Sequence, residues 1–161
     1  MPNSFVPELD APFLFRSRPE SIPGDFRPVW RIGLLLLILH VASRGSRSSF
    51  GRLHVMNWGI RSRHNHKVLQ DMLAGRLRPD TVLVRIEPSL NRAVDLAHGE
   101  GLIERVAGDR VRLTTRGEAE ADKLLEQKDV YVVEKDFLNA LGKHITEAFV
   151  DALYSREQGH P

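Results

Sequence analysis

The spacing of apolar and polar residues is most regular in the centre of the chain, over residues 88–126. There, an apolar stripe with the i, i+3, i+4, i+7 spacing of an amphipathic helix comprises Leu90, Ala93, Val94 and Ala97. Pro88 suits the first turn of this helix, where its missing N–H leaves no hydrogen bond unmade. Gly99 and Gly101 tolerate positive φ and are expected to end the helix.

The spacing of apolar residues changes after this helix from a helical period to alternation. Val111 and Leu113 alternate with Arg110 and Arg112, which is the pattern of a half-buried β-strand. The residues at 107–109, Ala-Gly-Asp, are typical of a turn. We therefore expect a β-hairpin whose arginines share the outer face.

A second helix is predicted directly after the hairpin. Thr115 is followed three residues later by Glu118, which is the spacing of a capping box. The order helix, hairpin, helix is typical of a winged helix-turn-helix domain, so we expect a mainly α fold with a small β-hairpin (α+β). Proteins of that fold usually bind DNA or dock to other proteins, and few are enzymes.

Three further helices are expected before this region. The first, residues 30–43, contains the apolar run 32–41, about ten residues where a membrane span needs roughly twenty. It is therefore interpreted as a helix that is buried on most of its circumference. A polar break at 44–49, with Gly45 as C-cap and a serine as N-cap, precedes the second helix. This second helix is expected at 50–62 and the third at 65–74, and a strand is expected at 81–86.

The two ends of the chain differ from its centre. Residues 1–28 hold six of the nine prolines and show no regular period, so we expect an extended arm anchored by its phenylalanines. Residues 134–154 are predicted to form one long helix with an apolar stripe made of Phe137, Leu138, Leu141, Ile145, Ala148, Phe149 and Ala152. We divide the chain into a Pro-rich arm (1–28), a winged-helix domain (29–127) and a C-terminal amphipathic helix with a short tail (128–161).

Composition excludes several kinds of site. The chain has no cysteine, which rules out disulfides, cysteine zinc sites, iron–sulfur clusters and thiol catalysis. No secretory signal is visible, and we expect a cytoplasmic protein without a membrane span. P-loop, nucleophile-elbow and paired-carboxylate patterns are missing, so neither an enzyme nor a cofactor is expected. His64 and His66 lack further metal ligands and are interpreted as an exposed loop or a phosphate contact.

Charge is unevenly distributed, although the net charge is only +2. Residues 42–80 carry eight Lys/Arg against two Asp, and residues 115–161 carry six basic residues against ten acidic ones. This polarity indicates either a contact of the basic band with DNA or solvated faces that happen to differ. The candidate phosphate contacts are Arg44, Arg47, Arg52, Arg61, Arg63, Lys67, Arg92, Arg105, Arg110 and Arg112.

The helix at 88–99 argues against a sequence-specific repressor. Its outward residues are expected to be Asn91, Arg92, Asp95 and His98. Asparagine and arginine read base edges, but Asp95 would face phosphates unfavourably and no lysine supports the contact. Specific DNA-binding proteins neutralise several phosphates, so the arginines of the hairpin are the better phosphate contacts.

The helix at 50–62 carries the motif Leu-His-x-x-Asn-Trp-x-x-Arg-Ser over residues 53–62. With the winged-helix half that follows, it resembles the middle components of bacterial ABC three-component systems, which include the Lamassu-type anti-phage systems. The resemblance spans roughly residues 29–127. It implies a non-enzymatic adaptor that binds an SMC-like or Rad50-like ATPase and is coupled to an effector, often a nuclease, that responds to foreign DNA. Our interpretation adds a non-specific contact with double-stranded DNA.

Two readings of the motif stay open. Asn57 and Arg61 share a helix face. In the first interpretation they bond to backbone carbonyls or to an acidic residue, and Trp58 packs inside the domain. In the second, all three residues contact a partner or DNA. The candidate docking residues are Trp58, Phe137, Leu141, Ile145 and Phe149. The alternative function is a stand-alone winged-helix transcriptional regulator that dimerises through its C-terminal helix, and a third is an accessory subunit of a chromosome-segregation complex.

Overall fold

The computed structural model describes residues 27–155. In chain order the elements are α1 (Pro28–Ala42), η2 (Arg44–Ser46), β1 (Arg47–Ser49), α2 (Phe50–Ile60), α3 (Arg63–Leu73), η3 (Pro79–Thr81), α4 (Pro88–Gly99), β2 (Ile103–Val106), β3 (Arg110–Leu113), α5 (Thr115–Glu126), α6 (Val132–Leu141) and α7 (Glu147–Tyr154). The chain is mainly helical with a small antiparallel sheet, which confirms the expected α+β class. Most of the predicted N-terminal arm lies outside the described residues.

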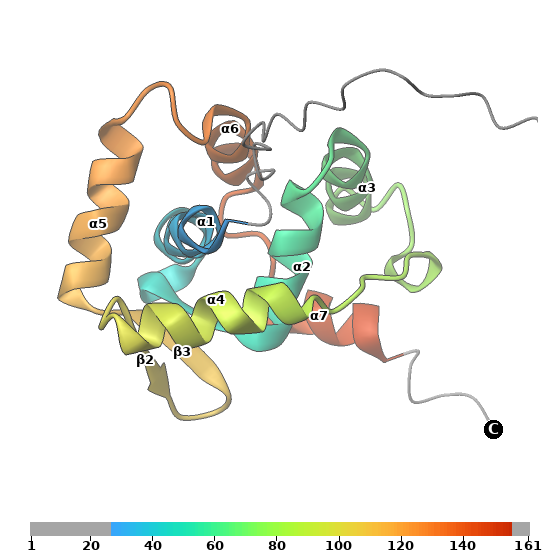
Figure 1. Ribbon diagram of the computed structural model, residues 1–161. Helices are drawn as coiled ribbons and strands as arrows, with labels where there is room; N and C mark the ends of the chain where they lie inside the picture. Colours follow the sequence, from blue (N-terminus) through green and yellow to red (C-terminus); the bar gives the residue numbers. More distant parts are fainter. Residues whose placement is uncertain (1–26, 156–161) are drawn as a thin grey trace, which may run out of the picture.

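Helix α1 forms the centre of the fold. In Figure 1 it is seen nearly end-on, and it contacts α2, α4, α5 and α6. Six consecutive apolar residues, 34–39, are buried in it, as expected for a helix covered on most of its circumference. Each such side chain contributes about 1.5–3 kcal/mol relative to an exposed one. Within residues 27–155 no helix is long and apolar enough to cross a membrane.

The sheet joins the predicted hairpin to a third strand. Strand β3 lies between β1 and β2, and both pairings are antiparallel. The hairpin is confirmed, with Val111 and Leu113 buried and Arg112 exposed. Strand β1 was not predicted, because its residues, Arg-Ser-Ser at 47–49, show no apolar alternation and lie in the expected polar break.

Hydroxyl side chains begin several helices. Each accepts a hydrogen bond from the backbone N–H three residues later, and the capping residues are Ser49, Ser62, Thr114 and Thr146. The expected serine cap of the helix at residue 50 is thus confirmed. The capping box of Thr115 and Glu118 is wrong by one position, because Thr114 accepts from the Gly117 N–H at 3.1 Å and Thr115 is already helical.

The strand predicted at 81–86 is wrong. Thr81 ends the short helix η3, and residues 82–87 have no regular secondary structure. Val84 is buried, whereas Leu83 and Ile86 are exposed. A sequence with β-propensity forms a strand only in a suitable sheet context, and this segment pairs with none of the three strands.

The single long helix predicted at 134–154 is also wrong. Gly142 ends α6 with φ 56° and ψ −143°, outside the helical region, and α7 begins at a new cap. On α7 the buried residues are Val150 and Leu153, whereas Ala148 and Ala152 of the predicted stripe are exposed. The break therefore rotates the second half of the stripe away from its expected face.

Candidate functional site

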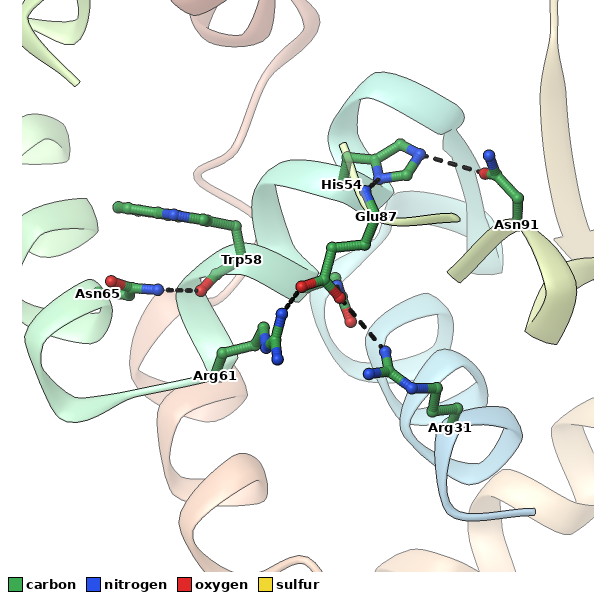
Figure 2. Close-up of polar contacts among 8 residues, drawn as sticks. Arg31, His54, Trp58, Arg61, Asn65, Glu87 and Asn91 are labelled. Carbon is green, nitrogen blue, oxygen red and sulfur yellow. Dashed lines mark hydrogen bonds and ion pairs between the residues drawn. The ribbon is translucent and has the colours of Figure 1, made fainter. Parts of the chain in front are cut away.

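One face of α2 is directed at the start of α4. His54, Asn57 and Arg61 follow one another at helical spacing, so they share this face. Figure 2 shows that His54 and Arg61 converge with Arg31 of α1 on Glu87, which stands immediately before α4. Asn57 is bonded to the carboxylate of the same residue. We call this cluster the α2–α4 clamp, and it comprises Arg31, His54, Asn57, Arg61, Glu87 and Asn91.

Glu87 binds side chains from two helices. Its carboxylate accepts a hydrogen bond from Asn57 Nδ2 at 3.1 Å and forms ion pairs with Arg61 and, at 3.4 Å, with Arg31. The Glu87 side chain is only 16% exposed, so these interactions are less screened by water than surface pairs are. Of the two readings of Asn57 and Arg61, the observed one is contact with an acidic residue of the same chain.

His54 adds a second link between the helices. Its Nδ1 accepts a hydrogen bond from the Glu87 backbone N–H at 3.4 Å, so Nε2 carries the proton and donates to Asn91 Oδ1, 3.2 Å away. Burial lowers the pKa of His54, and the hydrogen bond with Asn91 opposes that shift. The neutral imidazole is therefore the form that completes the clamp.

The link between α2 and α3 is held by polar contacts of its own. Asn65 donates from Nδ2 to the Trp58 carbonyl at 2.8 Å (Figure 2), and His66 donates from Nε2 to the Ile60 carbonyl at 3.1 Å. The His66 ring also stacks on Phe137, with ring centroids 4.1 Å apart. The part of the chain that the structure describes holds no group of three His, Cys, Asp or Glu side chains suited to a metal ion.

Most of the proposed docking residues lie in the core. Phe137, Leu141 and Ile145 are almost completely buried, so the prediction that they form a docking surface is wrong: the fold itself already covers them. Trp58 and Phe149 are half-buried and pack against the same core.

The outward face of α4 is largely engaged with the rest of the chain. Asn91, Arg92, Asp95 and His98 are exposed, as expected. Asp95 forms an ion pair with Arg105 of β2 at 2.6 Å, and His98 Nδ1 lies 3.2 Å from the carbonyl oxygen of residue 103. Asn91 is bound to His54, as described above.

A cleft of 660 Å³ lies between α2, α4, the hairpin and the end of α7. Apolar side chains line it together with the polar groups of the α4 face, and its lining includes Phe50, Ile86, Asn91, Asp95, Arg105 and Tyr154. Ile86 is 59% exposed. The guanidinium carbon of Arg105 lies 5.7 Å from the centroid of the Phe50 ring.

The ten candidate phosphate contacts differ in how they are paired and buried. Four of them form ion pairs within the chain: Arg61 with Glu87, Lys67 with Asp71, Arg105 with Asp95 and Arg112 with Glu104. Five more have no ion pair among residues 27–155, namely Arg44, Arg47, Arg63, Arg92 and Arg110. The tenth, Arg52, is buried in the first turn of α2.

No protein-family model, curated protein or solved structure matches the chain. The residues that sequence reasoning missed are Arg31 and Glu87, which complete the clamp. Glu87 carried one usable signal, because it stands directly before the proline that begins α4. Nothing in the sequence paired it with Arg31, which lies 56 positions earlier in the chain.

Proposed function

We propose that this chain is a non-enzymatic adaptor built on a winged-helix scaffold. The topology supports the scaffold: α1, β1, α2, α4, β2 and β3 follow one another in the order of a winged helix, and the sheet order β1-β3-β2 is also that of this fold. Helix α3 is then an insertion, α4 occupies the recognition position and the β2–β3 hairpin is the wing.

One observation favours docking over reading of bases. On α4, Asn91 is engaged by His54 and Asp95 by Arg105, so of the base-reading and charged side chains Asn91, Arg92 and Asp95 only Arg92 has no ion pair or side-chain hydrogen bond among residues 27–155. Leu96, in contrast, is 42% exposed on this helix. Sequence-specific DNA binding needs several phosphate contacts and free donors at the base edges, and protein interfaces need an apolar centre with a polar rim. The face of α4 is closer to a protein interface than to a surface that reads DNA bases.

The clamp supports the same proposal. It joins α2 to the start of α4 through Glu87, so the surface of α4 is held in one orientation before any partner arrives. A surface that is ordered in advance loses less conformational freedom on binding. The proposed partners are an SMC-like or Rad50-like ATPase and an effector such as a nuclease, which are the partners that the resemblance of the α2 motif implies.

The test is co-purification from the native operon with a tag on this chain. We expect Leu96→Asp to lose the ATPase, while Val133→Asp, a matched change at an exposed valine of α6, retains it. Both variants should keep the thermal stability of the parent, because exposed substitutions usually shift it by less than about 0.5 kcal/mol. If no ATPase co-purifies with the parent protein, or if Leu96→Asp retains it fully, the adaptor proposal is wrong.

The alternative, a stand-alone regulator that dimerises through its C-terminal helix, has less support. The apolar residues of that region, such as Leu138 and Leu141, belong to the common core with α1. A palindromic operator upstream of the gene, bound by the purified protein as a dimer, would favour the regulator.

A further inference from the structure

Arg52 is a buried arginine whose Nε has no hydrogen-bond partner in the described part of the chain. It stands in the first turn of α2 with only 8% of its surface exposed, and its Nε has no hydrogen-bond acceptor within residues 27–155. Buried polar groups are paired in the large majority of cases, and an unpaired buried charge is costly. The orphaned Nε therefore indicates that an acceptor from outside the described chain completes this position.

The surroundings of Arg52 are strongly basic. Burial lowers its pKa first, and the nearby guanidinium groups of Arg44 and Arg110 lower it further, while Glu147 acts in the opposite direction. Glu147 is partly engaged, because its Oε2 accepts a hydrogen bond from the Ser49 hydroxyl at 2.9 Å. Three positive charges thus face one negative charge, which leaves a local excess of two positive charges.

The backbone arrangement brings these groups to one corner. Ser49, the N-cap of α2, pairs in register with Arg110 of β3, so the β-strand places Arg110 beside the start of the helix. Side chains on a helix lean toward its N-terminus, which directs Arg52 to the same end. Arg44 is exposed at the turn η2 and leaves the corner accessible from solvent.

We propose that this corner binds a phosphate group, with Arg52 as its buried donor and Arg44 and Arg110 at its rim. A phosphate matches the excess of two positive charges and the paired donors of guanidinium groups, and a helix N-terminus also favours an anion. The phosphate group belongs either to a nucleic-acid backbone or to a small phosphate compound. The inference does not depend on the adaptor proposal, because it concerns a different surface from the face of α4.

The first experiment uses the full chain and measures thermal unfolding with inorganic phosphate or pyrophosphate. Either ligand should raise the Tm of the parent protein at about 10 mM, because a ligand of the native state stabilises it. Arg52→Met should abolish this rise and leave the Tm without ligand unchanged or higher, since it removes an unpaired buried charge. The matched control is Arg85→Met, an exposed arginine on the segment before α4, which should respond like the parent.

The second experiment separates the two sources of phosphate. Binding of two unrelated DNA duplexes is measured by fluorescence anisotropy from about 50 to about 200 mM salt. If a nucleic-acid backbone supplies the group, Arg52→Met should weaken both duplexes equally, by about tenfold. If a small compound supplies it, only pyrophosphate or phosphate binding should depend on Arg52.

Two further variants keep the proposal testable if Arg52→Met does not fold. Arg44→Met and Arg110→Met alter residues at the rim of the corner, and each should weaken binding of the responding probe by about tenfold. The proposal is overturned if no probe binds the parent protein. It is equally overturned if binding is the same in the parent and in the folded variants at Arg44, Arg52 and Arg110.

Discussion

Asn57 of α2 donates a hydrogen bond to the carboxylate of Glu87, 30 positions later and directly before α4. This bond shows that the motif of α2 serves the fold of the chain itself. Asn57 and Arg61 hold the residue from which α4 begins, and Arg31 extends the same contact to the central helix α1. Three helices therefore depend on one carboxylate.

The first prediction concerns this carboxylate. Glu87→Ala should lower the free energy of unfolding by about 2–3 kcal/mol, because it removes a largely buried carboxylate that forms ion pairs with Arg31 and Arg61. Glu87→Gln should cost less, since its amide oxygen still accepts from Asn57. Urea denaturation measures both changes. Glu118→Ala, at an exposed glutamate of α5, is the control and should be nearly neutral; equal effects at the two positions would contradict the clamp.

The second prediction concerns pH and His54. Burial lowers the pKa of His54 below its ordinary value of 6.5, so the unfolded chain binds this proton more readily than the folded chain. The contribution of His54 to stability is then complete above pH 6.5 and falls as the pH drops from there toward the folded pKa. Two-dimensional NMR of the histidine ring signals should show His54 titrating below pH 6.5.

A matched comparison isolates this effect. His54→Gln removes the titrating group, so its unfolding free energy should fall less than that of the parent between about pH 6.5 and pH 5. If His54 titrates at pH 6.5 or above, the assignment of a buried neutral imidazole is wrong.

The third prediction concerns the close approach of Tyr131 to α1. A Cβ at Gly33 would lie 2.3 Å from the Tyr131 hydroxyl oxygen, which donates to the Trp30 carbonyl at 2.8 Å. Gly33→Ala should therefore destabilise the protein by about 1–3 kcal/mol. Combining it with Tyr131→Phe should cost less than the sum of the single changes, because the clashing oxygen is gone. Gly99→Ala, with open space around the new Cβ, should be neutral or stabilising; an additive double variant would argue against the contact.

The fourth prediction distinguishes core from docking surface in the C-terminal region. Leu141 is 1% exposed, so Leu141→Ala should lower the unfolding free energy by about 2–5 kcal/mol. Val133→Ala, at an exposed valine on the same helix, should have a much smaller effect. Chemical denaturation checks both. A Leu141→Ala variant of normal stability that fails to co-purify with partners would restore the docking interpretation.

Sequence reasoning predicted the local features and missed those that depend on distant partners. The hairpin was predictable because Val111 and Leu113 alternate with arginines and a turn precedes them. Strand β1 was not, because Ser48 is buried by pairing with Val111 far along the chain and not by any pattern of its own. A glycine at 142 is compatible with a helix break, but the apolar residues on either side of it keep the spacing of one continuous helix. The sequence pattern therefore predicts no break there.

The candidate site was predicted in part for the same reason. The helical spacing of Asn57 and Arg61 indicated a shared face and an acidic partner inside the domain, but the identity of Glu87 requires the approach of α4 to α2. The excess of positive charge between residues 42 and 80 follows directly from counting charged residues in the sequence. Carboxylates contributed by other elements decide which cations are neutralised, as Arg61 is, and which keep a buried nitrogen without an acceptor among residues 27–155, as Arg52 does at Nε.

The central position of β3 in the sheet has a consequence for hydrogen exchange. Its backbone is bonded to β2 on one side and on the other to β1, which belongs to the turn between α1 and α2. The hairpin cannot detach without also breaking the β1–β3 ladder and withdrawing Val111 from the core. The inner amide protons of the hairpin should therefore exchange as slowly as those of α1, through unfolding of the whole domain. The hairpin would then be a measure of global stability, and not a flap that opens on its own.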